Sequence, residues 1–489
     1  MHVSNRFRDL HHVTRTIPSI AMIRSFFTCR FLSALFAAGG AVLVAALCLT
    51  SATSQQLTTS GGSYVQKGAA KKDNSGADTL IPREPESAIA RFEAFQEQLR
   101  KARASKDWQT YAATARELEQ FLNESPEAHL EMARALSDTG NLSEAIHQLK
   151  QFVQMSQYSS LIQLSAEFEP VRKLSDFAAL ERDMQQNRMP ISRSSQLCDV
   201  SDPALLTEDI DYDSQKKRFL ITSVREKKIV SVDASGVIRD FARSPDDWPF
   251  LAVKIDPKRK VVWATEVALR GFVFVPQKDW GRSAVLRYDL RSGSLLQRVE
   301  GPHGSALGDM ALTSQGEVIV SDGEGGGVYR ASANGGALPR LDNGDFISPQ
   351  TPVMLPDGER ILVPDYVRGI AVLEIATKKV RWLPTNGKFA LNGIDGMYLN
   401  RRTLIAVQNG SSPERVVAFT LNRELTGITS EDVFERSTAN LGDPTHGVVD
   451  NDNFYYIANS GWDVIDEHGN LKPGSKVSAA HIMRVQLAH

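Results

Sequence analysis

The residues with the clearest chemical potential recur at one place in a pattern that repeats through the second half of the chain. The copies align on an acidic or amide residue that ends an apolar run: Asp213, Asp256, Asn400 and Asp450. Four or five residues earlier, separate copies carry Glu208, Asp395 and His446, and a copy without the anchor carries Gln350 at the matching place. Two carboxylates, an amide and an imidazole, if brought together, suit a cation or a hydrolytic water.

Two further carboxylates adjoin this set. Asp209 follows Glu208, and Asp309 follows Gly308, which occupies the aligned position in its own copy. Both would strengthen a negative field, and Asp309 or His446 is the residue expected to take a proton. The alternative is a purely structural role, in which polar side chains at strand ends form hydrogen bonds with backbone groups around a water-filled channel.

The repeated pattern also predicts the elements that position these residues. From about residue 200 onward, strand-length apolar runs alternate with Asp-Gly, Asn-Gly and Gly-Gly turns at a spacing of roughly forty to sixty residues. The first copy spans Thr207 to Gly236, and about six can be counted. Such repeats are typical of a propeller. We predict an all-β six-bladed β-propeller over residues 196–489, in which the starts of the inner strands meet at one channel mouth.

Residues 81–195 have a helical period instead. Within Pro126 to Ser156, apolar residues recur at three and four residues on both sides of Gly140. This stretch resembles a tetratricopeptide repeat, in which Gly140 and Ala145 occupy positions of close helix approach. We predict a small α-helical, tetratricopeptide-like domain that serves either as a groove for a protein partner or as a spacer or lid on the blades. The polar stretch Gln185 to Gln196 is expected to be the domain boundary.

The N-terminus has the pattern of an export signal. Residues 1–54 contain the apolar run Phe31 to Leu49, which follows Arg24 and Arg30 and precedes small residues near Ala52. We predict a signal peptide, a flexible linker over residues 55–80, and a periplasmic or extracellular mature protein. The alternative is an uncleaved anchor, which would attach the chain to a membrane. Translation starting at Met22 instead of Met1 would leave a signal of ordinary length.

The composition and charge of the chain limit the classes of partner that it can bind. The formal net charge is −2 and no dense basic block is present, which argues against nucleic acid as a partner. A small-molecule substrate or ligand is expected at the predicted channel mouth. Cys29 and Cys48 fall in the predicted signal, so the mature chain would keep only Cys198 as a free thiol, with no disulfide.

From about Leu205 to Leu487 the chain resembles the six-bladed propellers of the senescence marker protein (regucalcin) and gluconolactonase family. Glu208 matches the first-blade Glu of that family, and Asp395 in GIDGM matches the Asp of its later "DG". Gln350 in SPQTP replaces the middle-blade Asn, and Gly308 replaces a substrate-binding Asn. The resemblance implies a divalent metal, commonly calcium, held here by Glu208, Gln350 and Asp395. His446 has no counterpart among those ligands, and as a ligand it would favour a transition metal over calcium.

Two functions follow as hypotheses. The first is a metal-dependent hydrolase of a lactone or related small ester, with Asp309 or His446 taking the proton. The second is a non-enzymatic propeller that binds a ligand or protein and uses the helical repeat to recruit a partner. The retained Glu208 and Asp395 favour the first, and the replaced Asn positions favour the second.

Overall fold

The computed structural model describes residues 87–487. The predicted signal (1–54) and linker (55–80), together with Cys29 and Cys48, lie outside the described residues. Within 87–487, no helix combines the length and the apolar character that crossing a bilayer requires.

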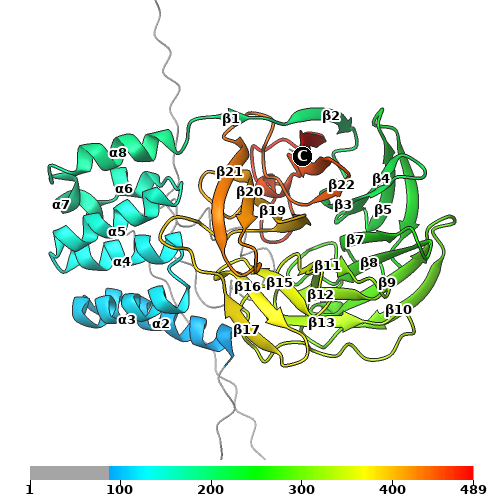
Figure 1. Ribbon diagram of the computed structural model, residues 1–489, viewed down its shortest axis with the longest axis horizontal. Coiled ribbons are helices and arrows are strands. Elements are labelled where there is room, and N and C mark those ends of the chain that lie inside the picture. The colour runs from blue at the N-terminus through cyan, green and yellow to red at the C-terminus, as the bar shows by residue number, and fades with distance from the viewer. Residues whose placement is uncertain (1–86, 488–489) are drawn as a thin grey trace, which may run out of the picture.

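The described chain forms six antiparallel sheets arranged as the blades of a propeller, as Figure 1 shows. Blades one and two consist of β3 (Thr207–Asp213), β4 (Arg218–Ser223), β5 (Lys228–Asp233), β6 (Ile238–Arg243), β7 (Phe250–Asp256), β8 (Val261–Val267), β9 (Ser283–Asp289) and β10 (Leu295–Glu300). Blades three and four consist of β11 (Leu307–Leu312), β12 (Val318–Asp322), β13 (Gly327–Ala331), β14 (Val353–Met354), β15 (Arg360–Asp365), β16 (Gly369–Glu374) and β17 (Lys379–Trp382). Blades five and six consist of β18 (Gly396–Asn400), β19 (Thr403–Gln408), β20 (Arg415–Leu421), β21 (Ile428–Arg436), β22 (Gly447–Asp450), β23 (Asn453–Ala458) and β24 (Ala480–Gln486).

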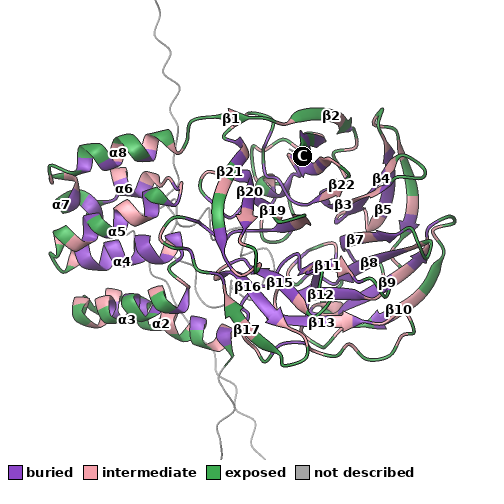
Figure 2. Ribbon diagram, viewed as in Figure 1, coloured by how far each residue is buried: buried purple, intermediate pink, exposed green. Residues whose placement is uncertain are grey.

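The first strand of every blade lies innermost, because β3, β7, β11, β14, β18 and β22 contact one another in a closed ring. The middle strands are nearly continuous apolar runs, as in β4 and β12, because neighbouring blades cover both of their faces. Outer strands such as β6 and β10 are largely exposed, and Figure 2 shows this gradient of burial. The six-bladed propeller predicted from the repeats is confirmed.

The ring closes with a strand from before the first blade. β2 (Ser195–Val200) pairs antiparallel with β24 and forms the outer edge of blade six. A short strand before it, β1 (Ile191–Ser192), pairs with the outer strand β21 of blade five. The predicted boundary stretch, Gln185 to Gln196, therefore contains β1 and the first two residues of β2.

The anchor residues of the repeat have a local structural role. Asp213 Oδ1 accepts a hydrogen bond from Lys216 N (3.2 Å), and Asp256 Oδ1 accepts one from Arg259 N (3.0 Å). Each carboxylate thereby fixes the hairpin turn after an inner strand, which is a common use of Asp at strand ends. Regular turns place successive inner strands in register, so equivalent residues of different blades reach the same end of the channel.

Seven α-helices precede the blades in the described part of the chain. They are α2 (Ala88–Ser105), α3 (Trp108–Phe121), α4 (Pro126–Asp138), α5 (Leu142–Gln154), α6 (Ser160–Leu164), α7 (Glu169–Arg172) and α8 (Phe177–Gln186). Their tetratricopeptide-like character stays a prediction, but the close helix approach expected at Gly140 is not found. A Cβ at Gly140 would meet no atom within 4 Å, and the residue has φ +80°, so the turn between α4 and α5 requires glycine for its backbone angle rather than for close packing.

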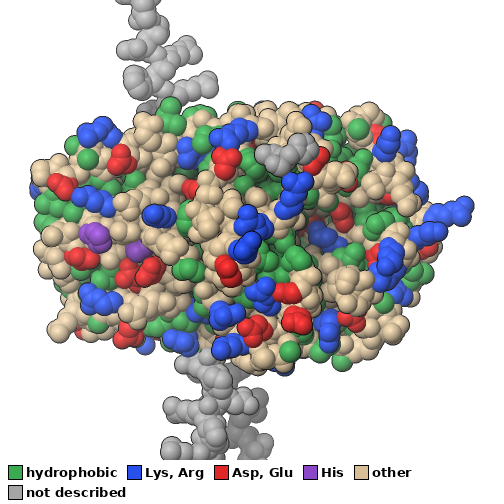
Figure 3. Space-filling model, viewed as in Figure 1, with side chains coloured by type: hydrophobic (Ala, Val, Ile, Leu, Met, Phe, Trp, Pro, Cys, Tyr) green, Lys and Arg blue, Asp and Glu red, His purple; other side chains and the backbone are tan. Residues whose placement is uncertain are grey.

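The helices pack on the propeller face that carries the starts of the inner strands. Ala88 N donates to Gly344 O (2.9 Å), Arg368 Nε donates to Phe121 O (3.0 Å), and Tyr158 N donates to Ser412 O (2.6 Å). These propeller residues belong to loops that precede inner strands or join the second and third strands, and both kinds of loop lie at that face. Figure 1 shows the helices beside β16, β17 and β21, and Figure 3 shows charges of both signs interspersed on the displayed surface.

Candidate metal centre

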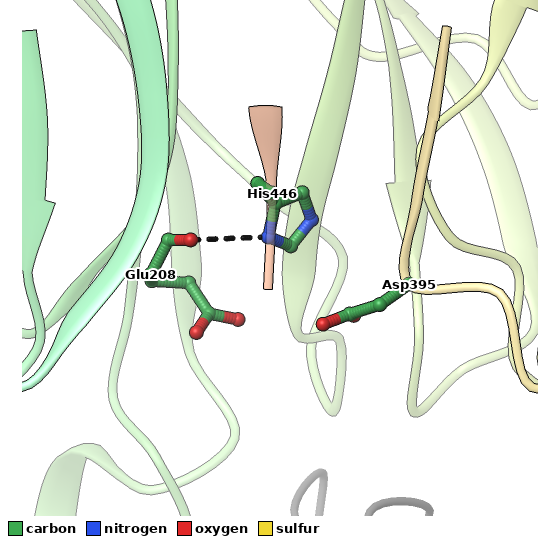
Figure 4. Close-up of side chains that lie close together, drawn as sticks. All are labelled: Glu208, Asp395 and His446. Carbon is green, nitrogen blue, oxygen red and sulfur yellow. Dashed lines mark hydrogen bonds between the residues drawn. The ribbon is translucent and has the colours of Figure 1, made fainter. Parts of the chain in front are cut away.

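Three of the aligned residues converge, as the repeat predicted. Glu208 is the second residue of β3, while Asp395 and His446 directly precede the inner strands β18 and β22. Each offers one ligand atom, and these atoms all lie within 4.8 Å of one another. Figure 4 shows the two carboxylates pointing toward one another beside the imidazole. The exposed fractions are 6% for Glu208, 4% for Asp395 and 0% for His446, so the group is buried.

The imidazole of His446 is oriented by the backbone of the neighbouring blade. Its Nδ1 lies 3.2 Å from the backbone oxygen of Glu208, the contact drawn as a dashed line in Figure 4. A carbonyl oxygen only accepts, so Nδ1 carries the hydrogen. In a neutral ring the lone pair is then on Nε2, which lies 3.0 Å from Asp309 Oδ1.

The contact between His446 Nε2 and Asp309 is close but poorly aligned. The separation is that of a hydrogen bond, yet its geometry is not, and Nε2 is among the buried polar atoms that lack a hydrogen-bond partner in the described chain. A lone pair this close to a carboxylate is repulsive, so a positive charge is favoured there, either a proton on Nε2 or a metal ion.

Without a bound metal, the charges around His446 favour protonation of its imidazole ring. Burial lowers the pKa of His446, but the nearby Asp309 and Asp395 outweigh burial and raise the pKa to about 10. The ring is therefore an imidazolium at neutral pH unless another cation replaces the proton.

Neighbouring side chains hold the two carboxylates. The indole Nε1 of Trp462 donates to Glu208 Oε2, and the side-chain amide of Asn409 donates to Asp395 Oδ2 (2.7 Å). The hydroxyl of Thr351 lies 3.0 Å from Asp309 Oδ2 and 2.9 Å from the backbone oxygen of Asp395.

The other sequence-predicted residues have different surroundings. Gln350 is buried, and within residues 87–487 its side chain donates only to Ser348, at 3.0 Å to the hydroxyl and 3.3 Å to the backbone oxygen. Its predicted role as a metal ligand stays a prediction. Asp209 pairs with Lys254 (2.9 Å), so its charge is matched by a cation. Cys198 is partly buried, and burial raises the pKa of its thiol to about 11, which leaves it protonated and poorly nucleophilic at neutral pH.

Two residues that contact the group were underestimated from sequence. Asn409 follows β19, the second strand of its blade, where an Asn is typical of a turn. Trp462 follows β23, the second strand of the last blade, and its indole contacts Glu208. The signal for Asn409 was its polar side chain at a strand end, but the same signal marks many ordinary turns.

The donor set fits a divalent cation. Two carboxylates and an imidazole are a usual combination of metal ligands. A cation could also coordinate Nε2 of His446, which has no hydrogen bond within the described residues. Glu208, Asp395 and His446 are the residues that would hold the ion.

No protein-family model and no curated protein matches the sequence. Among solved structures, the chain is similar to a gluconolactonase from Xanthomonas campestris, with 13% identity and a TM-score of 0.42 over 61% of this chain and 91% of that one. It is also similar to the PQQ-bound aldose sugar dehydrogenase of Streptomyces coelicolor, with 14% identity and a TM-score of 0.42 over 60% of this chain and 99% of that one. Likeness at this level carries no information on activity, and the fold assignment rests on the sheet topology described above.

Proposed function

We propose that the propeller is a metal-dependent hydrolase of a lactone or a related small ester. The observation that carries the proposal is the buried convergence of ligand atoms from Glu208, Asp395 and His446 within 4.8 Å of one another. Carboxylates alone would favour calcium, whereas an imidazole in the set favours a first-row transition ion such as manganese or zinc. When bound, such an ion polarises a carbonyl and lowers the pKa of a coordinated water.

The protein side chains have separate tasks in this proposal. Asn409 and Trp462 fix the carboxylates of Asp395 and Glu208, so that the ligand atoms are placed before the ion arrives. Asp309 is the carboxylate next to the ligand group, and its hydrogen bond from Thr351 leaves Oδ1 facing the group, where it can accept the proton of an attacking water. His446, first considered as a second proton acceptor, is assigned to the ligand set because its imidazole offers a ligand atom within 4.8 Å of those of Glu208 and Asp395.

Burial supports a small substrate. Glu208, Asp309, Asp395 and His446 are each at most 7% exposed, which favours a compact substrate over a bulky one. A lactone ring or a short ester meets that requirement, and its hydrolysis needs only water as co-reactant.

The second candidate is a non-enzymatic binding protein. It is favoured by the position of the helices, which contact Gly344, Arg368 and Ser412 on the face of the channel mouth and could present a partner there. A panel of lactones and short esters, assayed with added calcium, manganese or zinc, separates the two. The hydrolase is supported if added metal stimulates turnover and Asp309→Asn abolishes that turnover. It is refuted if the metal-loaded protein hydrolyses no member of the panel.

A further inference from the structure

We infer that Asn409 is a positioning residue that ties the Asp395 carboxylate to the chain segment carrying His446. The inference rests on the proposed metal site and adds a residue that its ligand set does not include. Asn409 directly follows β19 in blade five and is 3% exposed.

The amide of Asn409 uses both of its N–H groups. Nδ2 donates to Asp395 Oδ2 at 2.7 Å and to the backbone oxygen of Pro444 at 3.0 Å. Pro444 lies two residues before His446, so one side chain joins a proposed ligand to the segment that carries another. These two ligands come from adjacent blades, and Asn409 spans the junction between them.

The orientation of this amide is determined by its partners. The Asp395 carboxylate and the Pro444 carbonyl act as acceptors, so the NH₂ group must face them. The opposite atom, Oδ1, accepts from the Tyr366 hydroxyl at 3.0 Å. With all three contacts made, the amide has no alternative arrangement that satisfies its neighbours.

The backbone around Asn409 reinforces the link to Asp395. Gly410 N donates to Gly393 O (3.1 Å), two residues before Asp395. A Cβ on Gly393 would lie 2.6 Å from the backbone of Gly410, and Gly393 has φ +65°, so the two segments can approach this closely only with glycine at both positions. The loop after β19 is thus held against the segment that presents Asp395.

The preceding residue, Gln408, provides a control that distinguishes positioning of a metal ligand from a purely structural role. Gln408 is also a buried amide, and it donates to the backbone oxygens of Ala390 (2.9 Å) and Asn392 (2.7 Å). Gln408 Oε1 also accepts a hydrogen bond from the buried Arg415 (2.7 Å), so Gln408 makes as many contacts as Asn409 but touches no ligand side chain. Gln408→Leu is the matched control for Asn409→Leu.

The test uses the full chain and measures metal binding directly. Manganese and zinc are titrated calorimetrically into the parent, Asn409→Leu, Gln408→Leu and Tyr366→Phe, and the visible spectrum of the cobalt-loaded proteins is recorded. Loss of an outer hydrogen bond to a metal ligand typically weakens binding by about ten- to a hundredfold. We expect that weakening and an altered cobalt spectrum in Asn409→Leu, a smaller loss in Tyr366→Phe, and parental affinity and spectrum in the folded Gln408→Leu.

The outcomes separate this inference from the proposed function. A parent that binds none of the metals refutes the metal site itself. A parent that binds metal while Asn409→Leu and Tyr366→Phe keep its affinity and spectrum refutes the positioning role alone. Equal weakening in Asn409→Leu and Gln408→Leu, with unchanged spectra, would also overturn it, because general loosening of the loop would then account for the effect. Tyr366→Phe leaves the amide in place, so it tests the inference even if Asn409→Leu does not fold.

Discussion

Binding of a metal to His446 should release one proton, and the affinity should therefore rise with pH. The pKa of His446 without metal is about 10, with Asp309 and Asp395 overcoming the opposing effect of burial. At pH 7 the ring is about three pH units below that value, so freeing Nε2 costs about 4 kcal/mol, or roughly a thousandfold in affinity. Between pH 6 and 9 the logarithm of the association constant should increase by about one per pH unit.

Calorimetric titration in buffers with different ionisation enthalpies counts the released protons. The parent should release about one proton per bound ion at pH 7, and His446→Gln should release almost none and lose the pH slope. A matched His303→Gln variant, far in sequence from the ligand segments, should behave as the parent does. Metal binding by the parent without proton release would refute the assignment of His446 Nε2 as a ligand.

Three further results are expected. Asp395→Asn should weaken metal binding by orders of magnitude, because it removes the charge of a ligand. Asp309→Asn changes a neighbour of the ligands and should weaken binding by about ten- to a hundredfold. Equal losses in calorimetric titrations of the two variants would contradict the ligand assignment. Burial, followed by contact with Asp246, raises the pKa of Glu266 from 4.5 to about 8, so its folded form keeps the proton that the unfolded chain releases. Denaturant titrations should therefore show stability falling as pH rises from about 4.5 to 8, and Glu266→Gln should flatten that fall; an unchanged slope would contradict it. N-terminal sequencing of the exported protein should find a mature chain that begins after about Ala52, and retention of the preceding apolar run would identify an anchor.

The repeat was sufficient to predict the ring of blades and the meeting of three site residues. Glu208, Asp395 and His446 occupy equivalent places in their blades, and a closed ring brings equivalent places to one channel mouth. The closing strand β2 was not predicted to pair with β24, because its partner lies at the other end of the chain and no local pattern identifies it.

The side-chain contacts that hold the metal ligands in place were harder to predict from the sequence. Asp365 and Asn409 both occur at the end of a second strand, where their residue types predict a turn. Asp365 does cap its turn, accepting from Val367 N (2.9 Å) and Arg368 N (3.0 Å), whereas Asn409 reaches across to Asp395. Which of these a polar strand end does depends on the segment that precedes the inner strand of the same blade and, for the contact with Pro444, on the next blade. The sequence of a single strand encodes neither.

The most direct test of the metal centre is the metal content of the gently purified protein, by elemental analysis. The parent should carry about one divalent ion per chain, and a folded Glu208→Ala, Asp395→Ala double variant should carry none, because both carboxylate ligands are removed. The same two proteins, stripped and titrated with manganese and zinc, should differ in the same way. A folded parent that carries no metal and takes up neither ion would contradict the account, and so would a double variant that retains the parental content.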